Sequence, residues 1–336
     1  MKRLILLAIV FAMTLSLSAQ RNMQVWEGNT YSEFYTNDVD SVTFLLYPEG
    51  VLRECKPDTV FVTKTDTVEK IVTKHDTVTV IQKDTVYINT CKEDTKAIGK
   101  FSVSADKQVA FASGNLQYQA STDTWRFAEH QYDYIGAANS NISATYTGWI
   151  DLFGWGTGNN PTQSSTDNSD YQTFVDWGTN QIGDDAPNTW RTLTIGEWTY
   201  LFQHTHWTMA KVNDVLGFML LPDGFVAPAG MTVAILGDGN MSDNYKSFNE
   251  SDYADNQYTT EQFAQLEAQG CVFLPCAGYR DGSGVGGVGS YGYYWSATPY
   301  VSGIARYLGF FSTSAYTDNW GGRFLGQSVR LVQDLK

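Results

Sequence analysis

Short runs of alternating apolar and polar residues dominate the chain, and this pattern predicts β-strands more often than helices. Within residues 23–48 the alternation is broken at 27–29 and 36–38, where residues that favour turns stand together. The segment is therefore predicted to form a small hairpin or meander. Because so short a sheet has little core of its own, we expect it to dock onto another part of the chain or to stay partly mobile.

Residues 58–90 form an imperfect repeat of the tripeptide Asp-Thr-Val, with copies that start at Asp58, Asp66, Asp76 and Asp84. The spacing matches no solenoid or coiled-coil period, and the valines alternate with the period of a strand. Thr and Val favour β-conformation, and the Lys and Asp between them keep strand edges soluble. We interpret the repeat as an extended stalk, and a repeat that itself binds a ligand is the alternative.

The longest zone, residues 98–336, has a length typical of one β-rich domain. It opens with two strand-like runs around a turn. It contains two predicted helices, over 194–204 and 259–269: a Thr cap with Glu197 three residues later marks the start of the first, and Gly270 ends the second. Short strands and Gly/Asn/Asp loops make up the remainder, so the predicted fold class is α+β.

The first residues have the features of a secretory signal peptide. Lys2 and Arg3 precede an apolar run, and a Leu-Ser-Ala exit places cleavage after Ala19. An uncleaved membrane anchor is the alternative, but the run is short for a bilayer. No cysteine follows the run, so anchoring through a lipidated cysteine is not expected. We predict an exported protein, either attached to the cell surface or outer membrane or secreted, with a signal peptide (1–19), a small β segment (20–54), a spacer (55–97) and a head domain (98–336).

The charge balance limits the partners. The chain has 22 Lys+Arg against 36 Asp+Glu, a net charge of -14 that becomes 20 minus 36, or -16, once Lys2 and Arg3 are cleaved off. Such a surface repels nucleic-acid phosphates and anionic lipid, so no nucleic-acid partner is expected and membrane contact is expected only through surface attachment. Aromatic residues, at 14 % of the chain, suit recognition; about half of the tryptophans are expected in the core.

The four cysteines give no catalytic signature. Cys271 and Cys276 lie on a strand-like run at a spacing that places their side chains on opposite faces, so a disulfide between them needs a bend at Pro275. Buried thiols, or partners elsewhere, are favoured. Cys55 and Cys91 bracket the repeat and could close it with a disulfide in an oxidising compartment, but the sequence leaves the pairing open.

Other candidate chemistry is weak, and no cofactor is expected. The glycines at 284, 286 and 289 match a dinucleotide-binding spacing, but no helix can start after them, so a flexible loop is predicted. His204 and His206 would share a face of a strand without a third ligand. Acidic loops at Asp184-Asp185 and at Asp238 and Asp243 could hold Ca²⁺, but they lack EF-hand spacing and are read as solvated loops.

Three ordered segments carry a resemblance to a known family: WRTLTIGEWTYLF (190–202), GCVFLPCAGYRDG (270–282) and GYYWSATPY…ARYLGF…GQSVRLV (292–332). They resemble the Fibrobacter succinogenes major paralogous domain, a C-type-lectin-like family related in fold to formylglycine-generating enzyme. Residues 23–44 are similar to the segment that precedes such domains in exported Bacteroidetes proteins. The resemblance implies a C-type-lectin-like head of short antiparallel sheets, two helices and long loops, with Trp295 and a final SVRLV strand in its core.

In diversity-generating retroelement systems, similar domains hold variable residues on their last strands and loops for ligand binding. Carried onto this chain, the resemblance implies a fixed scaffold made of Trp295, Ala305, Leu308, Phe310, Ser328, Val329 and Arg330. The implied ligand-binding residues are Tyr300, Ile304, Arg306, Phe311, Tyr316, Trp320 and Phe324. The two-residue alternation of a strand agrees locally with this division into scaffold and ligand-binding residues, because Ile304 and Arg306 point opposite to Ala305 on a strand.

The preferred hypothesis is a non-catalytic cell-surface binding protein, an adhesin or receptor whose partner is an extracellular protein or glycan. A structural cell-envelope or fimbria-like subunit that self-associates is the first alternative. An enzyme of the formylglycine-generating type, or a hydrolase using Cys271 or the histidines, is the second; the late strand segment that carries the cysteines of that enzyme has none here.

Overall fold

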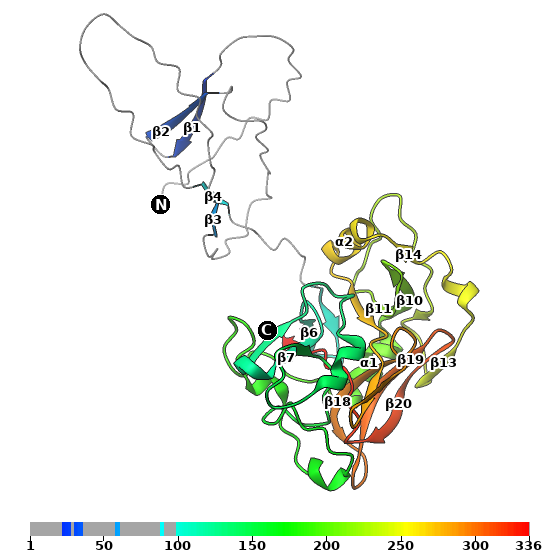
Figure 1. Ribbon diagram of the computed structural model, residues 1–336. Helices are drawn as coiled ribbons and strands as arrows, with labels where there is room; N and C mark the ends of the chain where they lie inside the picture. Colours follow the sequence, from blue (N-terminus) through cyan, green and yellow to red (C-terminus); the bar gives the residue numbers. More distant parts are fainter. Residues whose placement is uncertain (1–21, 28–29, 36–57, 61–87, 91–98, 336) are drawn as a thin grey trace, which may run out of the picture. The chain divides into compact units, whose positions relative to one another are not determined.

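The computed structural model describes residues 22–27, 30–35, 58–60, 88–90 and 99–335 (Figure 1). They belong to two compact units, 1–94 and 95–336. The predicted signal peptide, most of the repeat, Cys55 and Cys91 lie outside the described residues. Within the described ranges, no helix has both the length and the apolar character needed to cross a bilayer.

The N-terminal unit contains two short antiparallel pairs. Strand β1 (Asn22–Glu27) pairs with β2 (Thr30–Tyr35), and Glu27 lies opposite Thr30. This hairpin confirms the first part of the element predicted over 23–48. Strand β3 (Asp58–Val60) pairs with β4 (Ile88–Thr90), so the first and last segments of the repeat lie side by side.

The head, residues 99–335, has the mixed α+β architecture predicted from its alternation pattern (Figure 1). Its two α-helices are α1 (Ile195–His204) and α2 (Thr260–Ala268). Its strands are short and, with one exception, antiparallel. They are β5 (Phe101–Ser102), β6 (Gln108–Phe111), β7 (Leu116–Gln119), β8 (Thr124–Phe127), β9 (Trp149–Ile150), β10 (His206–Val212), β11 (Val215–Leu220), β12 (Gly237–Asp238), β13 (Tyr245–Ser247), β14 (Gln257–Tyr258), β15 (Val272–Pro275), β16 (Tyr279–Asp281), β17 (Gly284–Gly286), β18 (Gly292–Pro299), β19 (Ile304–Phe311), β20 (Ser314–Gly322) and β21 (Val332–Asp334).

Two sheets organise the head. One has the order β12-β10-β11-β15, with β14 added in parallel to β10, and the other has the order β13-β20-β19-β18. Near the C-terminus, β21 pairs with β6 from the start of the domain, which ties the two ends of the head together. Smaller sheets, β21-β6-β5 and β8-β7-β9, and the hairpin β16-β17 complete the fold.

Both predicted helices form, each with the predicted type of cap. At the start of α1 the Thr194 hydroxyl accepts a hydrogen bond from the Glu197 amide, and the Glu197 carboxylate accepts one from the Thr194 amide. The second helix has the same box between Thr259 and Gln262. Gly270 follows it with a φ of +88°, a conformation that glycine adopts without strain.

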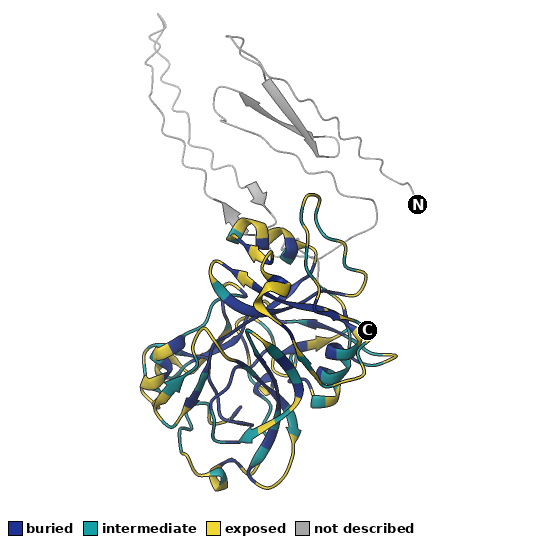
Figure 2. Cartoon of the chain, turned by 90° about the vertical axis from the view of Figure 1, so that its right-hand side faces the viewer, coloured by how far each residue is buried: buried dark blue, intermediate teal, exposed yellow. Residues whose placement is uncertain are grey.

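Three hydrophobic clusters fill the head, and the two main sheets separate them. The central cluster lies between the sheets and contains α1 residues such as Trp198 together with Phe218 of β11 and Phe310 of β19. A second cluster covers the other face of the β18–β20 sheet, and a third packs α2 against β10, β11 and β15. Figure 2 shows the buried positions running along these inner strands. Six tryptophans are buried in the head: Trp125, Trp155, Trp177, Trp198, Trp207 and Trp295.

The C-terminal segment differs from the expected strand. Ser328, Val329 and Arg330 are buried as predicted, but they form no regular ladder; Ser328 makes a single bridge to Tyr294, and β21 starts only at Val332. The backbone of this segment lies between two different strands: the Ser328 amide donates to the Tyr293 carbonyl of β18, and the Val329 carbonyl accepts a hydrogen bond from the Leu116 amide of β7. The Arg330 side chain adds hydrogen bonds to the carbonyls of Ala112 and Phe273.

Candidate binding surface

The seven predicted ligand-binding residues lie on the β18–β20 sheet and its connections. Their burial follows the expected alternation, because Ala305 is fully buried between the partly exposed Ile304 and Arg306. The seven predicted scaffold residues are all buried. The sheet does not bring the seven predicted ligand-binding residues into one group, however, and divides them between two places.

Tyr300, Arg306 and Trp320 form one exposed group, called here the aromatic patch. Arg306 lies opposite Trp320 in the β19–β20 ladder, and its guanidinium carbon lies 3.9 Å from the centre of the Tyr300 ring. The Tyr300 and Trp320 rings are stacked with centroids 6.4 Å apart. Tyr300 is 49 % exposed and Trp320 54 % exposed. Arg306 is held in place by an ion pair with Asp318, so the patch is a preorganised surface.

Ile304 and Phe324 lie at the same end of the sheet as the aromatic patch. Ile304 pairs with Gly322 across the ladder. The Phe324 ring lies over Gly322, where a Cβ atom would come within 2.5 Å of it. Both side chains are partly exposed and extend the apolar surface at this end.

Phe311 and Tyr316 belong to a second group, at the other end of β19 and the start of β20. The Phe311 ring packs edge-on against Tyr291 at 4.8 Å and against Tyr293 at 5.8 Å. Burial, and then the neighbouring Tyr316, raise the pKa of Tyr293 above its usual range. Phe311 and Tyr316 are half-buried in this cluster, so the expectation that they are displayed is met only in part, because their rings also serve as packing.

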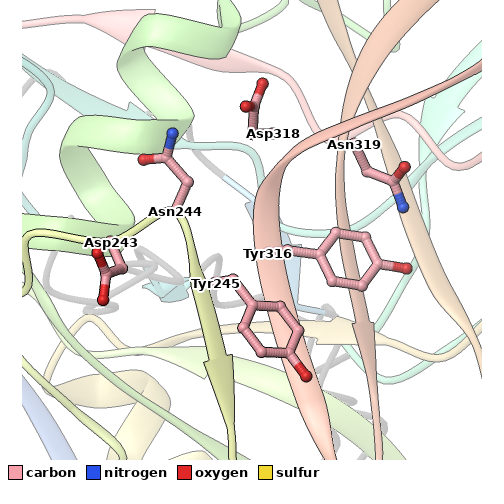
Figure 3. Close-up of a pocket in the computed structure, with 6 residues that line it drawn as sticks. All are labelled: Asp243, Asn244, Tyr245, Tyr316, Asp318 and Asn319. Carbon is pink, nitrogen blue, oxygen red and sulfur yellow. The ribbon is translucent and has the colours of Figure 1, made fainter.

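A surface pocket of about 450 Å³ opens beside Tyr316 and links the two groups (Figure 3). Its lining is two tyrosines, two aspartates and two asparagines: Asp243, Asn244, Tyr245, Tyr316, Asp318 and Asn319. Tyr245 lies directly opposite Tyr316 in the β13–β20 ladder, and the two rings are nearly parallel, at 13°, with centroids 6.5 Å apart. Asp318 belongs to the pocket and also pairs with Arg306 of the aromatic patch.

Sequence reasoning missed Asn244, Tyr245, Asp318 and Asn319 as site residues. Tyr245 comes from β13, a three-residue strand about seventy positions before its partner β20. Nothing in the local pattern around Tyr245 indicates which strand it pairs with.

A second, more polar depression of about 410 Å³ lies among the loops that carry Trp155, Asn160 and Tyr171.

The two cysteines of the head are buried, whereas His204 and His206 are exposed. Cys271 and Cys276 are free and buried in different clusters, on opposite faces as predicted from their spacing. Burial raises the pKa of Cys271 to about 12 and that of Cys276 further, so both thiols stay protonated at neutral pH. The His204 ring packs on Tyr200, and the His206 ring lies 3.0 Å from the Asp238 carbonyl.

The other candidate motifs have no ligand geometry in the described part of the chain. Gly284 and Gly286 lie in β17, which forms a hairpin with β16 and leads to β18 instead of a helix. The glycine segment is therefore partly a strand, where a flexible loop was predicted. Across residues 99–335 and the four short described strands before them, no group of three or more His, Cys, Asp or Glu side chains gathers as a metal site.

The fold and surface together define an α+β domain that presents an exposed aromatic patch next to an acidic pocket. No protein-family model, no curated protein and no solved structure matches the chain.

Proposed function

We propose that this chain is an exported binding protein, displayed on the cell surface or secreted, whose head has a C-type-lectin-like fold. The head recognises an extracellular protein or glycan through the last strands and loops and carries out no chemistry. Two features support this fold assignment: the short antiparallel sheets with two helices, and the burial of Trp295 and the other scaffold residues.

The aromatic patch is the observation that carries the proposal. Large aromatic side chains usually stabilise a fold by being buried, yet Tyr300, just after β18, and Trp320 of β20 remain about half exposed. The guanidinium of Arg306 stacks on the Tyr300 ring. Aromatic and Arg side chains presented in this way dominate the binding energy of many interfaces. The stacking of the Tyr300 ring with Arg306 and Trp320 also limits the conformational entropy lost on binding.

The thiol positions favour binding over the enzymatic alternative. A nucleophilic cysteine needs a thiolate in an accessible pocket. Cys271 and Cys276 are at most 1 % exposed, and the pKa of each is raised by burial. Neither thiol is placed for covalent catalysis.

Binding of the purified full chain to arrayed glycans and to whole bacterial and host cells tests the proposal. A Tyr300→Ala/Trp320→Ala variant should lose the binding. The matched control is Trp149→Ala, because Trp149 also stacks with an arginine, at 3.8 Å from Arg126, but lies on a different sheet. Binding that survives in the double variant would place the recognition surface elsewhere. If the chain instead assembles with itself as its concentration rises and binds no foreign ligand, the structural-subunit alternative is favoured.

A further inference from the structure

Three arginines of the head place their guanidinium groups over aromatic rings. Arg306 lies over Tyr300, Arg126 over Trp149 and Arg323 over Trp155, at 3.9, 3.8 and 4.3 Å from the ring centres. At the patch this stack is completed by a carboxylate, because Asp318 forms an ion pair with Arg306. At this one place in the domain, a tyrosine face and an aspartate together hold a planar cation.

The pocket of about 450 Å³ has the same parts but no cation of its own. Tyr245 and Tyr316 supply two nearly parallel rings, which lie side by side in Figure 3. The Asp243 carboxylate is exposed and has no hydrogen-bond or ion-pair partner among the described residues. No Lys or Arg of the described chain lines the pocket. Lys246, the nearest basic residue in sequence, alternates to the other face of β13 and lies opposite Ala315.

The polar groups of the pocket are preorganised by other contacts. The Asn244 side-chain oxygen accepts a hydrogen bond from the Gln203 side-chain nitrogen at 3.0 Å. The Asn319 oxygen accepts one from the Trp320 amide at 2.8 Å. The Asp318 carboxylate already forms an ion pair with Arg306. The Asp243 carboxylate, the 56 % exposed ring of Tyr245 and the partly exposed ring of Tyr316 therefore remain as the groups that can meet a ligand.

From this arrangement we infer that the pocket formed by Asp243, Tyr245 and Tyr316 binds an arginine side chain of a partner protein. The guanidinium lies against the tyrosine rings and pairs with the Asp243 carboxylate, in the manner of Arg306 between Tyr300 and Asp318. The inference rests on the proposed binding function and narrows its partner to a protein with an exposed arginine. The net charge of -14 favours the approach of such a basic partner.

Titration of the purified full chain with a short peptide of alternating Gly and Arg tests the inference, with the peptide in which citrulline replaces Arg as the uncharged probe of similar shape. Because an acidic protein attracts any basic peptide, variants must separate the pocket from general charge. Tyr245→Leu removes the ring, and Tyr245→Phe keeps it. Asp243→Asn removes one pocket charge, and Asp184→Asn removes one exposed charge outside the pocket.

We expect Tyr245→Leu and Asp243→Asn each to weaken binding of the Arg peptide about two- to fivefold, because both groups are exposed. Tyr245→Phe and Asp184→Asn should bind as the unchanged chain does, and the citrulline peptide should bind at least about tenfold more weakly. Equal weakening by Asp184→Asn and Asp243→Asn, unchanged binding by Tyr245→Leu, or equal binding of the citrulline peptide would each overturn the inference. The inference would also be overturned if the chain bound neutral methyl glycosides but not the Arg peptide, and if Tyr245→Leu abolished the glycoside binding.

The two proposals fail separately. Loss of binding to an arrayed ligand in the Tyr300→Ala/Trp320→Ala variant, with no effect of Tyr245→Leu on the Arg peptide, supports the proposed function and refutes the pocket inference. Arg-peptide binding that depends on Tyr245, with every arrayed ligand unaffected by the double variant, gives the reverse result.

Discussion

Asp151 provides the sharpest prediction for stability. Its carboxylate follows β9 and is fully buried. It accepts hydrogen bonds from the Ile135 amide at 2.9 Å and from the Asn139 side-chain nitrogen at 2.8 Å. Burial raises the pKa of Asp151 from 3.8 to about 6, although the hydrogen bonds from Asn139 and Ile135 oppose the shift. The folded chain therefore binds a proton here more tightly than the unfolded chain does.

The sign and size of the effect follow from this difference. A raised pKa in the folded state gives a contribution to stability that is complete below about pH 3.8 and is lost as the pH rises through about 6. A shift of about two pKa units corresponds to about 3 kcal/mol, at about 1.4 kcal/mol for each unit. From pH 4 to pH 7, Asp151 alone should therefore lower the free energy of unfolding by up to about 3 kcal/mol.

Urea unfolding of the unchanged chain and of Asp151→Asn at a series of pH values between about 4 and 7 isolates this contribution. The asparagine oxygen can accept one of the two hydrogen bonds, but its NH2 group faces the other donor and cannot accept from it. This loss lowers the free energy of unfolding by about 1–3 kcal/mol, and it does not depend on pH. The stability advantage of the unchanged chain should be greatest at the acid end and shrink by up to about 3 kcal/mol toward neutral pH. Asp184→Asn, a substitution of an exposed residue, should leave the profile unchanged. A constant difference between the chain and Asp151→Asn would refute the reasoning.

Two further substitutions and one labelling experiment test the fold. Arg330→Met should lower the free energy of unfolding by about 3–5 kcal/mol, measured by urea unfolding, because the buried carbonyl of Phe273 and other acceptors lose their donor; unchanged stability would contradict the structure. Burial opposes ionisation of Glu197, but hydrogen bonds from Arg191 lower its pKa, so Glu197→Gln should lower the free energy of unfolding by about 1 kcal/mol at neutral pH. This loss should vanish as the pH falls below the pKa of Glu197. A loss that persists in acid would count against the ion pair. Cys271 and Cys276 should react with a thiol reagent only after denaturant is added, and rapid labelling of the folded head would contradict their burial.

The helices and the division between buried and exposed strand positions could be predicted because their signals are local. Thr194 and Glu197 form the capping box that their spacing indicates. Cys271 and Cys276 lie on opposite faces because a strand alternates with period two. Ala305 is buried between two partly exposed neighbours for the same reason.

The composition of the candidate surface could not be predicted in full because it depends on pairing between distant segments. Tyr245 reaches Tyr316 only through the short β13–β20 ladder, and neither segment encodes that partner locally. The resemblance implied that Phe311 is a displayed residue, but rings of β18 and the turn before it pack around it. Arg330 was expected in a regular strand, and its hydrogen bonds to backbone carbonyls could be seen only once the surrounding segments were in place.

The central claim is that the aromatic patch recognises an extracellular ligand, and one equilibrium measurement tests it most directly. The dissociation constant of the strongest arrayed ligand is measured for the full chain, for Tyr300→Ala/Trp320→Ala and for Trp149→Ala, with the melting temperature of each. We predict that the double variant binds at least about tenfold more weakly, with a melting temperature close to that of the full chain because both rings are about half exposed, and that Trp149→Ala binds normally. Equal affinity in all three proteins would contradict the account.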